Sequence, residues 1–105
     1  MRWHPPSDNT QAIVDTIIST KWIVAIIRTL LEGPARFSGI RAAIPSISAK
    51  ILTSRLRYLE EQGVIRRTIM PPPAEREVYE LTSRGEAAKP IIEAILQWSS
   101  SFDGT

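Results

Sequence analysis

The pattern of apolar and polar positions between Ile47 and Gly63 predicts an amphipathic helix around which the rest of the chain is organised. Its three leucines are spaced i, i+4 and i+7, which places them on one helix face. Ser48 is a favoured N-cap residue because its hydroxyl accepts a hydrogen bond from a free N–H of the first turn. Gly63 ends the helix because glycine adopts the left-handed conformation without steric cost. Opposite Leu52, Leu56 and Leu59, the outer face carries Lys50, Ser54 and Arg57, with Thr53 on its flank.

A second, shorter apolar pattern comes before this helix. Ile40 and Ile44 form an i, i+4 pair on a helix expected over Ser38–Ala43. Pro45 and Ser46 then make a tight connection to the longer helix. Two helices joined by a turn of a few residues form a helix-turn-helix.

After Gly63 the period changes from that of a helix to that of a hairpin. Val64–Ile69 suits a strand, and apolar and polar residues alternate near the end of Arg76–Leu81, which is expected to be the return strand. The intervening segment 70–75 contains a run of prolines and cannot be a regular strand, because proline lacks the N–H donor and fixes φ. A hairpin with a stiff tip after a helix-turn-helix predicts a winged helix.

Apolar helices are expected at both ends of the chain. A short helix over Thr10–Ile18 is followed by a second over Lys21–Leu31, which Thr20 caps and which is expected to be buried on most sides. Towards the other end, Thr82 caps a long final helix. Pro90 lies inside this helix and is expected to kink it, because proline interrupts the hydrogen-bond ladder.

The predicted fold class is therefore mainly α with a small β-hairpin (α+β), a winged helix-turn-helix with extra N- and C-terminal helices. A chain of 105 residues is long enough for one domain. We expect an N-terminal arm at 1–9, the domain at 10–102 and a short tail at 103–105. The aromatic residues Trp22, Tyr79 and Trp98 are expected in the core rather than as stacking platforms.

The distribution of charge along the chain indicates what kind of partner the protein binds. The whole chain has a net charge of +2, but residues 36–67 contain seven basic and two acidic residues, a net charge of +5, which leaves −3 for the rest. A basic middle between neutral or acidic ends indicates an anionic partner for the helix-turn-helix. An ordinary mixed surface would also account for these charges.

The composition argues against several other classes of protein. With no cysteine and one histidine, His4, the sequence offers no metal-ligand cluster, no disulfide and no nucleophile–base pair, so neither a cofactor nor an enzyme is indicated. The first residues lack the apolar core of a signal peptide. The longest apolar run, Trp22–Ile27, is too short to span a bilayer. We therefore expect a cytoplasmic protein without a membrane partner.

Taken together, these motifs resemble the HxlR family of bacterial and archaeal winged helix-turn-helix transcription regulators. The matching stretches are KW at 21–22, GPARFSGIR at 33–41, SISAKILTSRLRYLEEQGVIRR at 46–67, YELTSRG at 79–85 and the tryptophan at 98. The chain departs from the family at Gly39, where members often have an acidic residue. It also lacks the cysteine near the N-terminus that some members use to sense electrophiles or oxidants.

The resemblance implies that the protein binds double-stranded DNA through the helix-turn-helix and the hairpin. Arg and Lys donate to guanine edges in the major groove, and Ser and Thr contact bases or phosphates. Ser38 can also be a simple N-cap, a role that can coexist with DNA contact. For Arg55, packing or pairing with a carboxylate is at least as plausible as DNA contact. The expected DNA-binding residues are Arg36, Ser38, Ser48, Lys50, Thr53, Ser54, Arg57, Arg67 and Arg76.

The same resemblance implies a homodimer that reads a palindromic operator through its terminal helices, which carry more apolar surface than one core needs. The alternative is that the two terminal helices pack on each other within one chain. A protein–protein interaction module and an RNA-binding winged helix also remain open, as does an unidentified small-molecule effector. The expected interface residues are Ile13, Ile17, Ile92, Ile95, Leu96, Trp98 and Phe102.

The absence of cysteine makes a prediction about regulation. Diamide or peroxide should leave DNA affinity unchanged, apart from slow oxidation of Met1 or Met70, because no thiol is present to react. A gel-shift titration before and after treatment measures this. Rapid loss of DNA binding that a thiol reductant reverses would contradict the prediction.

Overall fold

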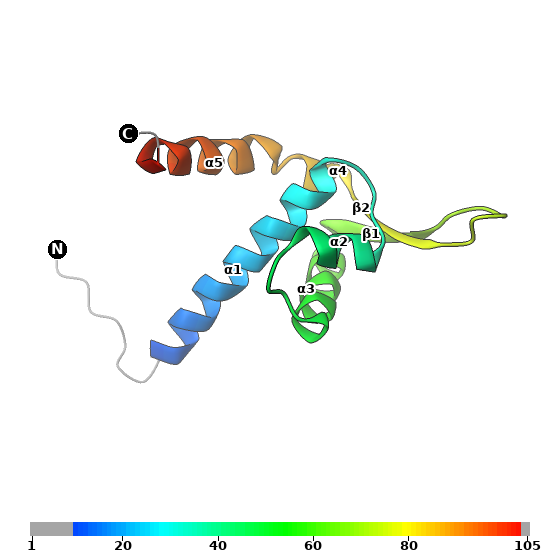
Figure 1. The fold of residues 1–105 in the computed structure, drawn as a ribbon, viewed down its shortest axis with the longest axis horizontal. Coiled ribbons are helices and arrows are strands. Elements are labelled where there is room, and N and C mark those ends of the chain that lie inside the picture. Colours follow the sequence, from blue (N-terminus) through cyan, green and yellow to red (C-terminus); the bar gives the residue numbers. More distant parts are fainter. Residues whose placement is uncertain (1–9, 104–105) are drawn as a thin grey trace.

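A computed structural model describes the backbone of residues 10–103 and the side chains of residues 20–98 and 100. The central helix α1 has α2, α3 and the hairpin on one side and α5 on the other (Figure 1). This arrangement confirms the predicted fold class, whereas the expected N-terminal arm lies outside the described residues. The elements are α1 (Thr10–Leu31), α2 (Phe37–Ala43), α3 (Ala49–Glu61), β1 (Ile65–Ile69), β2 (Glu77–Leu81), α4 (Ser83–Glu86) and α5 (Lys89–Asp103).

Helix α3 has the predicted inner face and the predicted ends. Its three leucines are at most 2% exposed. Ser48 is the N-cap, and its hydroxyl accepts a hydrogen bond from the N–H of Ile51 at 3.1 Å. Beyond the last turn Gly63 has φ +73°, a conformation that other residues adopt only at a steric cost.

The hydrophobic core joins α3 to all the larger elements around it. Trp22 and Tyr79 are partly buried against it, as predicted. Trp98, however, is 65% exposed on α5, so the expectation that it lies in the core was wrong. The buried apolar residues are Ile26, Ile27, Leu30, Ile40, Ile44, Ile47, Leu52, Leu56, Leu59, Ile65, Leu81 and Ile92.

Helix α1 is continuous, whereas the sequence predicted a break at Ser19-Thr20. No glycine or proline lies between Thr10 and Leu31, and serine or threonine inside a helix costs only about 0.5 kcal/mol relative to alanine. The same helix shows how threonine is accommodated, because the Thr29 hydroxyl donates to the Ala25 carbonyl at 2.8 Å. A capping residue type alone therefore does not begin a new helix.

The predicted long final helix is in fact two helices. Thr82 caps the four-residue α4, accepting a hydrogen bond from the N–H of Gly85 at 3.3 Å. Pro90 cannot donate to the carbonyl of Glu86 and would clash with it, so the ladder ends there. A new ladder starts with Ile92 N–H donating to the Ala88 carbonyl at 2.9 Å, which leaves Pro90 in the first turn of α5.

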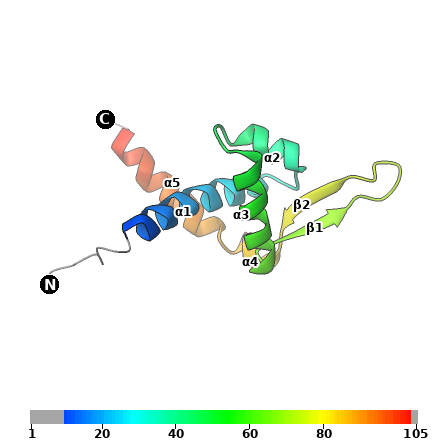
Figure 2. The same cartoon turned by 90° about the horizontal axis from the view of Figure 1, so that it is seen from below.

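The hairpin projects from the body of the molecule, and we call residues 65–81 the wing (Figure 2). Its strands are antiparallel, and Arg66 lies opposite Glu80. At its tip the Met70 N–H donates to the Arg76 carbonyl at 2.8 Å. Near its base Ala35 and Tyr79 exchange two backbone hydrogen bonds, of 3.0 and 2.8 Å, which tie β2 to the segment between α1 and α2.

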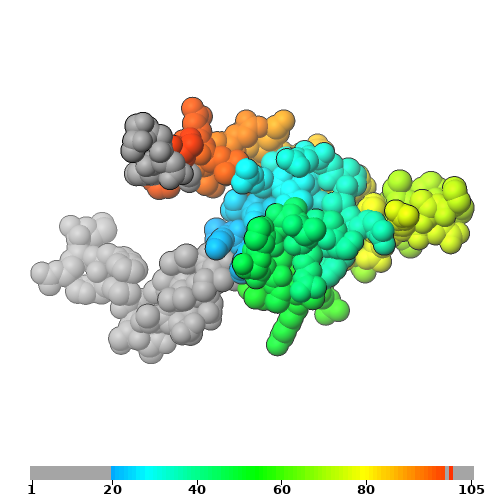
Figure 3. Space-filling view, in the orientation of Figure 1, coloured from blue at the N-terminus to red at the C-terminus, as the bar shows by residue number. Residues whose placement is uncertain are grey.

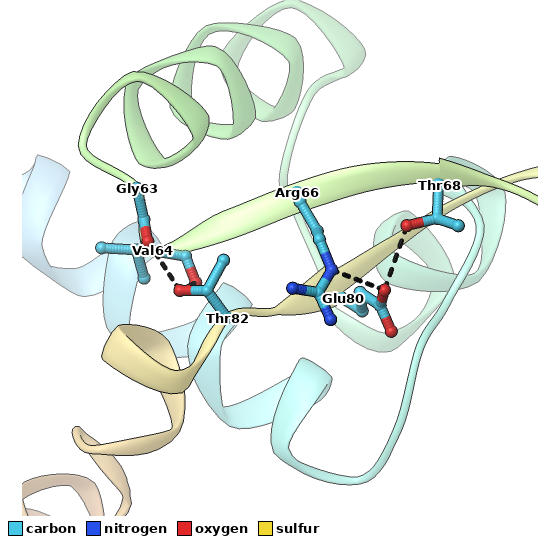
Figure 4. A network of polar contacts seen from close by, with 6 residues as sticks. All are labelled: Gly63, Val64, Arg66, Thr68, Glu80 and Thr82. Carbon is cyan, nitrogen blue, oxygen red and sulfur yellow. Dashed lines mark hydrogen bonds and ion pairs between the residues drawn. The ribbon is translucent and has the colours of Figure 1, made fainter.

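The two ends of the wing are joined at its base (Figure 4). The Thr82 hydroxyl donates to the Gly63 carbonyl at 2.6 Å, and the Val64 carbonyl oxygen is 3.1 Å away. The backbone N–H of Thr82 also donates to the Val64 carbonyl, at 3.0 Å. The side chain and the backbone N–H of Thr82, which follows β2, thus hold it to Gly63 and Val64, which precede β1.

This junction leaves no room for a side chain at Gly85, which gives a prediction about stability. A Cβ there would collide with the Val64 carbonyl oxygen and come within 2.8 Å of a Leu81 methyl carbon. We expect Gly85→Ala to lower the free energy of unfolding by about 1–3 kcal/mol. Urea denaturation followed by circular dichroism measures this change.

Gly39 provides the matched control for this substitution. It lies on the exposed side of α2, and an added Cβ would meet only the Ala35 Cβ, at 3.9 Å. Gly39→Ala should therefore stabilise the protein by about 0.5–1 kcal/mol, because alanine loses less backbone entropy on folding. Equal denaturation midpoints for the two variants would contradict the close packing at Gly85.

Candidate nucleic-acid interface

The outer face of α3, which consists of Lys50, Thr53, Ser54 and Arg57, is exposed along its whole length. These four side chains line one shallow surface depression together with Tyr58 and Glu61. Neither Lys50 nor Arg57 forms an ion pair with any residue that the structure describes. The two cations can therefore meet an external anion without first breaking an internal ion pair.

Helices α2 and α3 form a bulge in front of α1, and the wing is a separate lobe beside it (Figure 3). A helix that buries one face in the core and presents the other on such a bulge can enter a DNA major groove, which is about 12 Å wide. Strand β1 of the wing contacts α3, and Arg67 of β1 binds Glu60 of α3. The shape of the molecule thus suits a helix-turn-helix docked in a groove.

The first helix of the motif begins one residue earlier than predicted. Helix α2 starts at Phe37, and Arg36 is its N-cap residue without a side-chain capping bond. Ser38 lies within the first turn and is exposed, so the alternative that it caps the helix was wrong. Arg36 and Ser38 both remain exposed beside the N–H groups of that turn.

The two arginines of the wing that were expected to bind DNA, Arg67 and Arg76, have different surroundings. Arg67 is bound within the protein: its Nε lies 3.0 Å from each carboxylate oxygen of Glu60, and its Nη1 lies 3.6 Å from Glu77. The hydrogen bond with Glu60 raises the pKa of the Arg67 guanidinium. Arg76 is exposed at the tip and pairs with no carboxylate in the described part of the chain.

A second arginine of β1 also pairs within the wing. Arg66 Nε donates to Glu80 at 2.8 Å, and the Thr68 hydroxyl donates to the same carboxylate at 3.0 Å (Figure 4). These two hydrogen bonds hold the pKa of Glu80 below its ordinary value. The Glu80 carboxylate forms an ion pair with Arg66.

Arg55 differs from its neighbours on α3 because it is half-buried. Its Nη1 donates to the Ser54 hydroxyl at 3.4 Å. This position at the edge of the leucine face agrees with the alternative in which the Arg55 stem packs against the protein.

The sequence profile of the HxlR-like helix-turn-helix proteins matches residues 17–105. The chain belongs to this family. The match includes the whole helix-turn-helix and the wing.

Curated relatives of this HxlR-like protein are named as transcriptional regulators. The uncharacterized HTH-type transcriptional regulator YvaP of Bacillus subtilis is 40% identical over 86 residues, which are 82% of this chain and 80% of YvaP. The HTH-type transcriptional regulator YodB of the same organism is 32% identical over 83% of this chain and 78% of its own length. An archaeal HTH-type regulator from Methanothermobacter thermautotrophicus is 38% identical over 81% of this chain and 65% of its own length.

Solved structures of YodB have the same fold. Its reduced form matches with a TM-score of 0.72 at 29% identity, covering 94% of this chain and 95% of that one. Its diamide-treated form matches with a TM-score of 0.65 at 34% identity, covering 77% and 80%. The likeness confirms the winged helix fold of this chain.

Helix α5 of this HxlR-like chain has two apolar faces. Ile92 and Leu96 face inwards, and Ile92 is only 4% exposed. Ile92 therefore belongs to the core of its own chain, whereas the sequence analysis had placed it on a surface that a partner covers. Ile91, Ile95 and Trp98, spaced i, i+4 and i+7, are 62%, 40% and 65% exposed. The side chains of the expected interface residues Ile13, Ile17 and Phe102 lie outside the described residues.

Sequence reasoning missed two residues with exposed apolar surface. Tyr58, 47% exposed, lines the depression on α3, and its spacing of i+4 from Ser54 could have revealed it. Ile91 on α5, 62% exposed, was not among the expected interface residues. Its i, i+4, i+7 relation to Ile95 and Trp98 was the available signal.

The described residues offer little for other kinds of chemistry. None of the helices described has the length and apolar character needed to cross a membrane. No group of three His, Cys, Asp or Glu side chains suited to a metal ion occurs among residues 20–98.

Proposed function

We propose that this protein is a cytoplasmic transcription regulator that binds a palindromic double-stranded DNA operator as a homodimer. The observation that carries the proposal is the outer face of α3, where two exposed cations without internal ion pairs flank exposed hydroxyl groups. In this docking mode α3 lies in the major groove. Membership of the HxlR-like family and its relatives named as transcriptional regulators support the same function.

The proposed contacts fall into two kinds. Lys50, Thr53, Ser54 and Arg57 face base edges and adjacent phosphates from α3. Arg36 and Ser38 at the start of α2, Ser48 before α3, and Arg76 on the wing hold the DNA backbone. Arg67 is bound to Glu60 and Glu77, so we do not assign it a direct contact with DNA.

The proposed dimer rests on the second apolar face of α5. Two isoleucines and a tryptophan are exposed side by side there, and soluble monomers rarely leave such a stripe uncovered. A two-fold axis would bring the same face of two copies together and place two α3 helices on the halves of a palindrome. We propose Ile91, Ile95 and Trp98 as the described part of this interface, with Ile13, Ile17 and Phe102 as further candidates. Leu96, which the sequence also placed there, packs against its own core.

A binding assay tests the DNA face directly. With the strongest duplex that wild type selects from a random-sequence pool, Arg57→Ala should cost about 1–3 kcal/mol if Arg57 makes a bidentate base contact. Arg36→Ala should instead weaken all duplexes similarly and reduce the salt slope by about one unit, because it removes a phosphate contact. Gel-shift titrations at several salt concentrations give both quantities.

Lys89→Ala is the control for loss of a positive charge, since Lys89 is the first residue of α5, outside the helix-turn-helix and the wing. It should leave affinity nearly unchanged. If Arg57→Ala bound the selected duplex as wild type does, the assignment of α3 as the recognition helix would be wrong. Preference for RNA or single strands in the same assay, or no nucleic-acid binding at all, would also contradict the proposal.

The dimer has its own prediction. Ile95→Asp places a charge in the centre of the exposed α5 stripe and should give monomers, with a collapse of operator affinity, while the helix-turn-helix stays folded. Gln97→Asp is the matched control, because it adds the same charge on an exposed side of α5 away from the stripe. Sedimentation at micromolar concentration measures the association state. A wild-type monomer that binds a palindrome without cooperativity would rule out the dimer.

A further inference from the structure

One face of the wing joins its two strands to each other, and the other face joins the wing to α3. Alternate residues of a strand point to opposite faces. Arg66 and Thr68 therefore share one face of β1, where they bind Glu80 and link the two strands to each other (Figure 4). Arg67 points to the other face, where it meets a residue of α3.

Arg67 joins three elements through one guanidinium. Its own position is on β1, its Nε lies 3.0 Å from both oxygens of Glu60 in the last turn of α3, and its Nη1 lies 3.6 Å from Glu77 on β2. It is the bridge from the wing to α3 among the ion pairs of the described residues. Of the other attachments of the wing, the Thr82 hydrogen bonds lie at its base, whereas the Ala35–Tyr79 backbone pair holds β2 level with Arg67, because Arg67 and Tyr79 lie opposite each other.

The tip of the wing extends beyond this point. Arg76 lies three residues away from Tyr79, the partner of Arg67, which is about 10 Å at about 3.3 Å per residue, so a rotation of about 10° at Arg67 would move Arg76 by about 2 Å. A shift of that size would take a side chain at the tip out of reach of a phosphate. The exposed cation at the tip is Arg76, whose contact with DNA would therefore depend on the angle between the wing and α3.

We infer that Arg67 is a positioning residue, which through Glu60 sets the angle of the wing against α3 so that Arg76 reaches the DNA backbone. This inference rests on the proposed DNA-binding function. It assigns Glu60, an acidic residue beside a surface that binds a polyanion, a favourable role in binding. Charge alone predicts that an acidic residue here weakens DNA binding, whereas this inference predicts that Glu60 strengthens it.

The test compares two acidic neighbours at the end of α3. Glu60→Ala and Glu61→Ala each remove one negative charge, but Glu61 lies at the end of the outer face and forms no ion pair with a described residue. By charge alone, both variants should bind DNA at least as tightly as wild type. We expect Glu61→Ala to do so and Glu60→Ala to bind about three- to tenfold more weakly.

A double-mutant cycle distinguishes positioning from a general loss of structure. Arg76→Ala should weaken binding in the wild-type and Glu61→Ala backgrounds but have little further effect in the Glu60→Ala background, where the tip no longer reaches its phosphate. Arg76→Ala should likewise reduce the salt dependence of DNA affinity in the wild-type and Glu61→Ala backgrounds but not in the Glu60→Ala background. Thermal unfolding should hardly move, because exposed ion pairs contribute little to stability.

Arg67→Lys provides a second variant in case Glu60→Ala is poorly folded. Lysine keeps the charge but lacks the planar fork that binds both carboxylate oxygens, so we expect the same loss of affinity as for Glu60→Ala. If Glu60→Ala or Arg67→Lys bound the selected duplex as tightly as wild type, and Arg76→Ala kept its full effect, the inference would be overturned. A wild-type protein that bound no duplex would instead overturn the proposed function.

Discussion

The burial of three leucines on one side of α3 determines what the other side can do. Leu52, Leu56 and Leu59 are almost completely buried, and each such side chain contributes about 1.5–3 kcal/mol of hydrophobic free energy. A rotation of α3 large enough to hide Lys50 or Arg57 would bring leucines into water. The orientation of the proposed recognition face is therefore a consequence of core packing against α1 and needs no additional interaction to hold it.

The sequence predicted those elements whose signals are local. The leucine repeat, the Ser48 cap and Gly63 together define α3, and the prolines of the tip separate two strands whose bounds the structure moves by only one residue. The errors arose where a local signal had to compete with its surroundings. Thr20 is a good capping residue, but nothing ends the preceding helix, so α1 continues; Pro90 ends one helix and lies in the first turn of the next.

The sequence predicts the site only for residues on a helix, where the helical period tells which side chains are exposed. Lys50 and Arg57 lie opposite a leucine face, so their exposure was predictable. Arg67 could not be judged in this way, because its partner Glu60 lies on another element, beyond the reversal of the chain at Gly63. Residue type assigned Arg67 to DNA, whereas the fold gives it two carboxylates. Basic residues on a wing therefore cannot be counted as DNA contacts until their internal partners are known.

The position of α5 makes the two proposed interactions compatible. Helix α1 lies between α5 and α3, so a partner that covers Ile91, Ile95 and Trp98 would leave the outer face of α3 open (Figures 1 and 2). Ile92 and Leu96 meanwhile hold α5 to its own chain from the opposite apolar face. In the proposed dimer, a change in how the two α5 helices pack would alter the spacing of the two α3 helices, because α1 contacts both α5 and α3 of its own chain. In a protein without cysteine, a non-covalent ligand or partner acting at this interface could alter DNA affinity without touching a single DNA-contacting side chain.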